Sequence, residues 1–159
     1  MIDPTRRATA ADRSPLVRMA RRAWDEAEGQ RGGPQFLRER GPLAGWIDRL
    51  DALIDGEDAL VLVGGIDGVP LGFALAQLRR FDADETVVEL PALYTEPEAR
   101  SVGIAAGLMA TVASWAGDVG ATGLDAAVLP GNRSAKNFFE SFGMKARLIQ
   151  VHRRLDGDG

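Results

Sequence analysis

The chain has 159 residues, of which 45% are hydrophobic and 26% are charged, as in one globular domain. It has no cysteine and one histidine, His152, which excludes disulfide scaffolds, thiolate nucleophiles, cysteine-ligated zinc and multi-histidine metal sites. The net charge is −4, divided into +3 over residues 1–49 and −7 over the rest, and so mild an asymmetry argues against a nucleic-acid partner.

No apolar run approaches the roughly 20 residues that a membrane-spanning helix needs. Residues 1–7 also lack the apolar segment of a signal peptide. We therefore expect a cytoplasmic protein that binds neither membranes nor nucleic acid. Residues 1–155 are predicted to form a single domain, and residues 156–159 a flexible tail.

The first third of the chain predicts a short strand and several helices. The strand is expected at residues 5–8, and a helix with Asp12 or Ser14 near its N-terminal cap follows. Its apolar residues recur at helical spacing until a glycine-rich break at residues 29–33. A second helical stretch, residues 36–54, is interrupted by a Gly-Pro pair.

The rest of the chain alternates strands with two helices. The predicted elements are strands at 59–63, 71–78 and 86–94, a helix at 102–116, a strand at 124–129, a helix at 133–142 and a strand at 144–155. An antiparallel meander is thus followed by a β-α-β crossover. This order predicts an α/β fold (α+β mixed sheet) with helices on both faces.

The segment with the clearest chemistry is residues 93–105, where a strand ends, a proline marks a turn and a helix opens. Small residues such as Gly103 and Ala105 would let a ligand approach the backbone, and the first-turn N–H groups have no partner within the helix. Together with the helix dipole, these groups suit a phosphate or pyrophosphate. The structural alternative is a plain strand–turn–helix in which the same small residues pack against the sheet.

Two motifs resemble the GNAT superfamily of N-acetyltransferases. Arg100-Ser101-Val102-Gly103-Ile104-Ala105 resembles its Gln/Arg-x-x-Gly-x-Gly/Ala loop, and residues 93–97 resemble the hydrophobic lead-in that ends in an acid and a proline. Residues 132–144 are similar to its Asn-x-x-Ala-x-x-hydrophobic-aromatic-x-x-x-Gly-Phe signature, with Met144 for the last Phe. The resemblance covers nearly the whole chain in the expected element order.

The resemblance implies a fold with splayed central strands that binds acetyl-CoA as co-substrate, with no metal. The loop amides would hold the pyrophosphate, and the pantetheine arm would pair with the strand at residues 86–94. The residues that the resemblance places against acetyl-CoA are Leu93, Tyr94, Thr95, Arg100, Ser101, Val102, Gly103, Ile104, Ala105, Asn132, Ser134 and Phe139.

Two positions have alternative interpretations. Proline is excluded from central strands except at bulges, so Pro91 indicates either the bulged, splayed strand of the family or a sheet edge. Asn132 is either a ligand-binding residue or an ordinary helix N-cap.

Direct acetyl transfer to an amine requires a group that takes the amine proton, and Glu89 is the best candidate. It is the only acid in the apolar strand, and burial would raise a carboxylate pKa toward the useful range. The alternative is an outward acid that keeps the strand soluble. Pro91 occupies the position where family members most often carry their Glu, and Phe139 stands where many carry a Tyr that protonates the departing thiolate.

These departures leave two functions open: an N-acetyltransferase, which we favour, or an acyl-CoA-binding sensor that has lost catalysis. A dinucleotide-binding Rossmann unit is rejected because residues 103–107 lack the Gly-x-Gly-x-x-Gly pattern and follow a meander. The predicted acceptor is a primary amine of a small molecule or peptide, and the resemblance is compatible with a homodimer.

Overall fold

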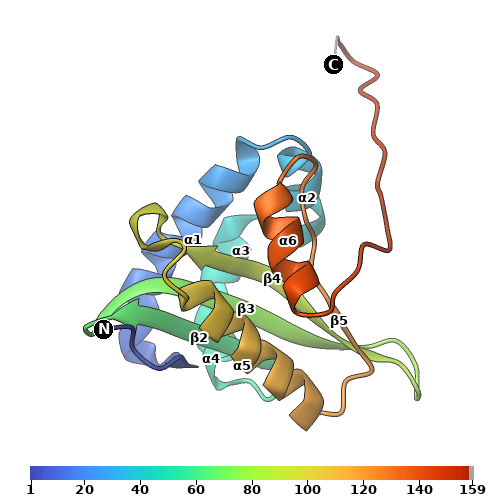
Figure 1. Cartoon of the computed structure of the whole chain (residues 1–159). Coiled ribbons are helices and arrows are strands. Elements are labelled where there is room, and N and C mark those ends of the chain that lie inside the picture. Colours follow the sequence, from blue (N-terminus) through green and yellow to red (C-terminus); the bar gives the residue numbers. More distant parts are fainter. Residues whose placement is uncertain (158–159) are drawn as a thin grey trace.

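A mixed five-stranded sheet forms the centre of the computed structural model, which describes residues 1–157 (Figure 1). Its order is β1-β2-β3-β4-β5; β4 and β5 are parallel and the other neighbours antiparallel. The strands are β1 (Arg6–Arg7), β2 (Ala59–Ile66), β3 (Val69–Arg80), β4 (Thr86–Thr95) and β5 (Gly123–Asp125). The predicted meander followed by a β-α-β crossover is confirmed.

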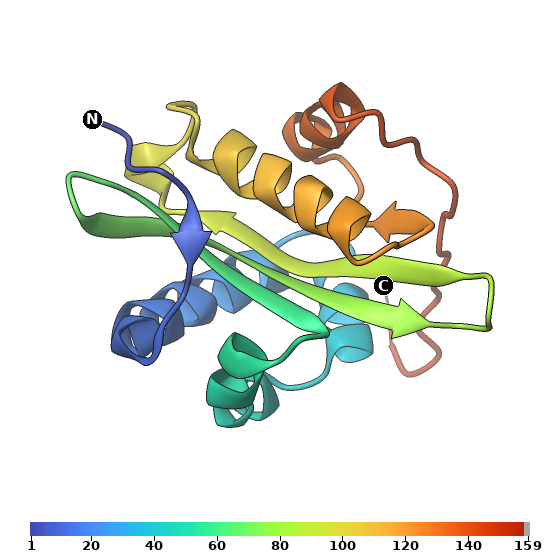
Figure 2. The same ribbon diagram turned by 90° about the horizontal axis from the view of Figure 1, so that it is seen from below.

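Helices cover both faces of the sheet (Figure 2). One face carries α5 (Ile104–Asp118) and α6 (Arg133–Ser141). The other face carries α1 (Arg13–Glu28), α2 (Gly33–Arg40), α3 (Leu43–Asp48) and α4 (Leu50–Asp55). Short 3₁₀ turns span Ala10–Asp12 and Pro97–Ala99. Two cores result, because apolar side chains alternate between the faces of β2 and β3. Within residues 1–157, no helix is long and apolar enough to cross a membrane.

The second predicted helical stretch forms three helices. Gly41 has a φ of 81°, a left-handed conformation that ends α2, and the extended Pro42 then starts α3. Trp46 of α3 closes the corner, since its Nε1 donates to the carbonyl of Arg40 at 2.8 Å. This corner carries the end of α2 to the edge of β4.

The C-terminal strands differ most from the predictions. Of the strand expected at 124–129, only Leu124 and Asp125 are paired, and Gly123 before them is paired as well; the pairing stops where β4 turns away beyond Glu89. The strand predicted at 144–155 is wrong for this structure: these residues pair with no strand among residues 1–157. Their sequence favours a strand, but no neighbouring strand lies beside them to supply hydrogen bonds.

The start of α1 is stabilised by a half-buried ion pair. Asp12, only 6% exposed, accepts hydrogen bonds from Arg6 Nη1 and Nη2 at 2.7 and 2.8 Å and from the Thr9 N–H at 2.8 Å. These bonds, led by the one to Arg6, lower the Asp12 pKa to about 2 from its usual 3.8.

We expect this carboxylate to make folding stability depend on acid. Because the pKa of Asp12 is lower in the folded protein than in the unfolded chain, the stabilisation is present above pH 4 and is lost as the pH falls toward 2. The carboxylate contributes about 1–2 kcal/mol to the free energy of unfolding. Urea unfolding at pH 5 and pH 2 should show a smaller loss in Asp12→Asn than in wild type. Asp51→Asn, which removes the exposed partner of Arg13, serves as control and should behave like wild type. Equal losses in Asp12→Asn and wild type would contradict the assignment.

Candidate active site

The loop before α5 presents a row of unpaired backbone amides. Ser101 and Gly103 have left-handed φ values of 68° and 103°, and Gly103 caps the helix. Within residues 1–157, none of the N–H groups of residues 101–106 donates a hydrogen bond to a protein acceptor. Successive amides in such a turn, at the positive end of a 15-residue helix, form a concave anion-binding surface.

Two glycines of the sheet let α5 approach closely and so fix this loop. A Cβ on Gly64 or on Gly72 would lie 2.8 Å from Cγ2 of Ile104, the first residue of α5. Ile104 is therefore buried against β2 and β3, while the preceding residues stay exposed. The packing alternative placed Gly103 and Ala105 against the sheet, but Gly103 is exposed and Ala105 is only half-buried. Ile104 makes the close contact with the sheet, and Gly103 serves the backbone turn.

The side chain of Arg100 holds the loop in place through hydrogen bonds. Its Nε donates to the carbonyl of Thr95 at 2.9 Å, and its Nη2 lies 2.7 Å from Oε2 of Glu26 on α1. These contacts tie the loop to the end of β4 and to the opposite helix layer. The Arg100 side chain is thus hydrogen-bonded within the protein, whereas the backbone N–H groups of residues 101–106 are free to bind a ligand.

The strands β4 and β5 part beside this loop. They pair at Val87–Gly123, Val88–Leu124 and Glu89–Asp125, and in residues 1–157 no further pair follows. The pairing of β3 with β4 shifts at the same point: Leu75 faces Ala92 and Gln77 faces Glu89, which leaves two residues of β4 opposite one of β3.

Pro91 lies in this bulge, as the resemblance implies. An extra residue in one strand bends that strand, and proline is tolerated there because it has no N–H to donate. The edge interpretation also describes part of the arrangement, since β4 has no β5 partner beyond Glu89. The bulge is therefore where the two strands open.

Arg40, at the end of α2, covers the bulge. Its Nε donates to the Pro91 carbonyl at 3.0 Å, and its Cζ lies 3.7 Å from the centre of the Phe36 ring. Burial lowers the pKa of Arg40, and the charge of nearby Glu89 opposes that shift. Among residues 1–157 its Nη groups have no hydrogen-bond acceptor, so they remain available to a ligand.

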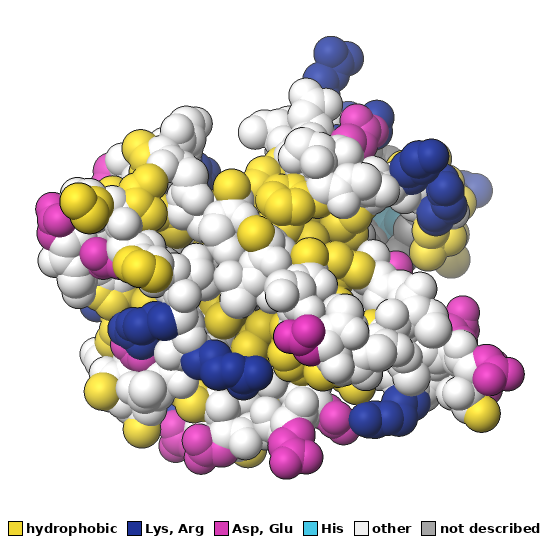
Figure 3. Space-filling view, turned by 60° about the horizontal axis from the view of Figure 1, so that its bottom comes forward, with side chains coloured by type: hydrophobic (Ala, Val, Ile, Leu, Met, Phe, Trp, Pro, Cys, Tyr) yellow, Lys and Arg dark blue, Asp and Glu magenta, His cyan; other side chains and the backbone are white. Residues whose placement is uncertain are grey.

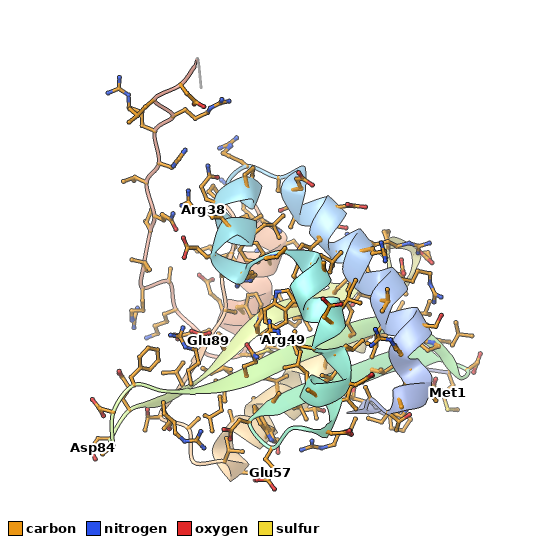
Figure 4. All side chains as sticks on the ribbon, turned by 180° about the vertical axis from the view of Figure 1, so that it is seen from behind. Met1, Arg38, Arg49, Glu57, Asp84 and Glu89 are labelled. Carbon is orange, nitrogen blue, oxygen red and sulfur yellow. The ribbon has the colours of Figure 1, made fainter. Side chains whose placement is uncertain are left out.

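Glu89 lies on the sheet face that carries α1–α4, the near side of β4 in Figure 4. Its side chain is 32% exposed, and its Oε1 lies 2.8 Å from Nη1 of Arg79 on β3. The expected burial of this carboxylate is therefore wrong. The bulge accounts for its partner, since it sets Glu89 opposite Gln77 and diagonal to Arg79. The carboxylate is accessible and adjoins the point where the strands part.

The strongly buried acid of this region is Glu96, for which the sequence suggested no role. It is 3% exposed, and its Oε2 accepts from Arg22 Nη1 at 2.7 Å and from the Tyr94 hydroxyl at 3.2 Å. Burial, followed by the charge of Glu96, raises the pKa of Tyr94. Tyr94 packs against Phe73 in the core, which favours a structural role for the only tyrosine of the chain. The sequence feature that could have identified Glu96 is its place as the acid before Pro97 in the lead-in at residues 93–97.

The last helix lies over the other side of the opening. Asn132 caps it, since its Oδ1 accepts from the Ala135 N–H at 3.0 Å, which confirms the N-cap interpretation. Ser134 is exposed, and Phe139 is half-buried with its ring centre 5.3 Å from that of Phe138. Figure 3 shows hydrophobic side chains gathered near the centre of the surface on this side. In residues 1–157 no three His, Asp or Glu side chains are grouped in a way that could hold a metal ion.

The geometry therefore joins an anion-binding loop, two parting strands, an accessible acid and an apolar helix face. The family model described as Acetyltransferase (GNAT) family matches residues 17–144. The chain belongs to this family. The match includes the loop, the bulge and the signature of the last helix, and it assigns the protein to the acetyltransferases.

Solved structures of low identity share the fold of this acetyltransferase. One is AAC(6')-Iy in complex with the bisubstrate analog CoA-S-monomethyl-acetylneamine, at 19% identity over 97% of this chain and 99% of that chain (TM-score 0.74). A second is the apo aminoglycoside 6'-N-acetyltransferase AAC(6')-IG from Acinetobacter haemolyticus, at 16% identity over 96% and 99% (TM-score 0.68). A third is a transcriptional regulator from Bacillus halodurans C-125, at 16% identity over 98% and 100% (TM-score 0.69). No curated protein matches the sequence significantly.

Proposed function

We propose that the protein transfers the acetyl group of acetyl-CoA directly to a primary amine. The observation that carries this proposal is the position of the unpaired amides of residues 101–106 beside the opening between β4 and β5. The unpaired amides suit a diphosphate, and the opening between the strands suits an extended pantetheine chain. The CoA-containing structure of similar fold supports the same arrangement.

In this proposal, residues of three elements hold the co-substrate. The amides of Val102, Gly103, Ile104 and Ala105 bind the pyrophosphate, with Arg100 and Ser101 flanking them. The pantetheine arm lies along the open edge of β4 at Leu93, Tyr94 and Thr95. The last helix contributes its start and its apolar face through Asn132, Ser134 and Phe139.

The chemistry needs one proton acceptor and no covalent enzyme intermediate. The neutral amine attacks the thioester carbonyl, Glu89 accepts the amine proton directly or through water, and collapse of the tetrahedral intermediate releases the CoA thiolate. The chain has no cysteine, so an acyl-cysteine intermediate is excluded. Arg79 holds the carboxylate of Glu89 in place at the bulge.

Two measurements test the proposal. Saturating acetyl-CoA should raise the melting temperature, and thiol release from acetyl-CoA should require an amine drawn from a panel of aminoglycosides, small amines, amino acids and peptides. Stabilisation without thiol release would favour the sensor, an alternative to which the regulator of similar fold gives some support. No stabilisation at all would overturn both functions.

We expect Phe139→Tyr to increase turnover by at most about 10²-fold. A thiol has a reference pKa of ~8.5, only about 1.5 units above neutrality, so the departing CoA needs little help from an acid. An amine such as lysine, with a reference pKa of ~10.4, has the harder proton to lose. Steady-state kinetics on wild type and variant provide the check, and Phe138→Tyr on the same helix is the control. A much larger gain would show that the missing acid limits the wild-type enzyme.

A further inference from the structure

The guanidinium of Arg40 lies half-buried over the bulge of β4. Its Nε donates to the Pro91 carbonyl at 3.0 Å, and its Cζ lies 3.7 Å from the centre of the Phe36 ring. Within residues 1–157, neither of its Nη groups donates a hydrogen bond to the protein. N–H groups that lose water on burial and gain no acceptor destabilise the folded protein. The guanidinium therefore favours a bound partner with acceptor oxygens.

The charges around the bulge are mostly positive. Glu89 is the carboxylate whose charge acts on Arg40, but its Oε1 already lies 2.8 Å from Nη1 of Arg79. The Cζ of Arg49 lies 4.6 Å from the centre of the Trp46 ring, and Trp46 donates to the Arg40 carbonyl at 2.8 Å. Three guanidinium groups and one carboxylate thus lie around this corner. The balance favours a second carboxylate, brought by a ligand.

The corner lies on the side of the sheet from which an acceptor reaches Glu89. The loop proposed to bind the pyrophosphate precedes α5 on one face of the sheet, whereas Glu89 lies on the face that carries α1–α4 (Figures 2 and 4). Pro91, which accepts the bond from Arg40, follows Glu89 by two residues, a span of about 6–7 Å along a strand. A small molecule can therefore contact the Arg40 guanidinium at one end and Glu89 at the other.

We propose that Arg40 binds the carboxylate of the acceptor and that this acceptor is a free amino acid, an inference that rests on the proposed acetyl transfer. The planar guanidinium matches both oxygens of a carboxylate, and the short span to Glu89 suits a molecule that carries its amine close to its carboxylate. The amine nitrogen bonds to the acetyl carbon, the C–S bond of the thioester breaks, and the amine proton passes through Glu89 to the departing thiolate. An N-acetyl amino acid and CoA are released.

The same charges disfavour a polycationic acceptor. An aminoglycoside carries several ammonium groups, which Arg40, Arg49 and Arg79 would repel. We therefore expect a lower kcat/KM for every aminoglycoside than for the preferred amino acid. An aminoglycoside that exceeds all amino acids would overturn the proposal.

The main experiment compares each of the twenty amino acids with its own carboxamide, which keeps the amine and replaces the carboxylate by a neutral group. Arg40→Gln should lower the ratio of kcat/KM for the preferred amino acid over its carboxamide by about 10–10²-fold, mainly through KM. The difference in amine basicity cancels when this ratio is compared between wild type and variant. An unchanged ratio would overturn the proposal.

Arg38→Gln is the matched control. Arg38 lies two residues earlier on α2, its Nε lies 3.6 Å from Oε1 of Glu39, and it is placed apart from Glu89 in Figure 4. The same substitution there should keep the wild-type ratio. An equal fall of the ratio in both variants would show that any loss of charge from α2 has this effect, and it would overturn the role of Arg40.

Binding measurements separate a failure of this proposal from a failure of acetyl transfer. In wild-type protein saturated with CoA, calorimetry should show the amino acid bound about 10–10²-fold more tightly than its carboxamide. This comparison needs neither turnover nor a variant that folds, and equal affinities would overturn the carboxylate site. Succinyl-CoA, offered with amines that lack a carboxylate, tests the other source of this group. A preference for succinyl-CoA over acetyl-CoA that depends on Arg40 would place the carboxylate on the acyl group and overturn the proposal.

Discussion

Replacing Glu89 by Gln should lower kcat by about 10²–10⁴-fold and leave the affinity for acetyl-CoA nearly unchanged. The amide keeps the size of the carboxylate and can still accept a hydrogen bond from Arg79, but it cannot take a proton from the amine. Steady-state kinetics over pH 5–9 and binding of acetyl-CoA by calorimetry provide the measurements.

The chain offers a closely matched control. Asp58 forms an ion pair with Arg80, the residue after Arg79 on β3, and its Oδ2 lies 2.8 Å from Arg80 Nη1, the same distance as in the Glu89 pair. Asp58→Asn removes a carboxylate–arginine pair from the same sheet, away from the bulge, and should leave kcat unchanged. Equal losses in both variants, or near-wild-type turnover in Glu89→Gln, would show that Glu89 serves the structure and not the reaction.

The elements of the fold are predictable where local pattern and tertiary contact agree. The continuous apolar run of β2 and the glycine turn before β3 each predict their element, and the structure has both. The segment 144–155 fails because strand propensity describes the segment alone, whereas a strand also needs a neighbour to pair with.

The candidate site was predictable in its backbone and less so in its side chains. Gly103 marks the loop because a left-handed φ favours glycine, and Pro91 marks the bulge because proline is excluded from regular central strands. The partners of Glu89 depend on how many residues the bulge displaces, which only the register of β3 against β4 determines. Arg40 reaches the bulge through the α2–α3 corner, a tertiary arrangement without a local signature.

Gly103→Glu should abolish the stabilisation of the protein by acetyl-CoA. At about a hundred times its dissociation constant, the ligand should stabilise the wild-type fold by ~2.7 kcal/mol, or roughly 5–10 °C in melting temperature at this chain length. The variant places a negative side chain among the amides proposed to bind the pyrophosphate. It also forces a non-glycine residue to a φ of 103°, which should cost about 1–2 kcal/mol of apo stability. Thermal melts with and without acetyl-CoA separate the two effects.

Gly120→Glu is the control for backbone strain and added charge. Gly120 also has a left-handed φ, 73°, and it lies beyond the opposite end of α5, where a Cβ would meet nothing within 4 Å. Its variant should lose similar apo stability and still gain the full shift from acetyl-CoA, because the loop amides are untouched. If Gly103→Glu keeps the wild-type shift, the unpaired amides of residues 101–106 do not bind the pyrophosphate, and the co-substrate must be held elsewhere. If both variants lose the shift, the loss reflects a weakened helix α5 and not a blocked anion site.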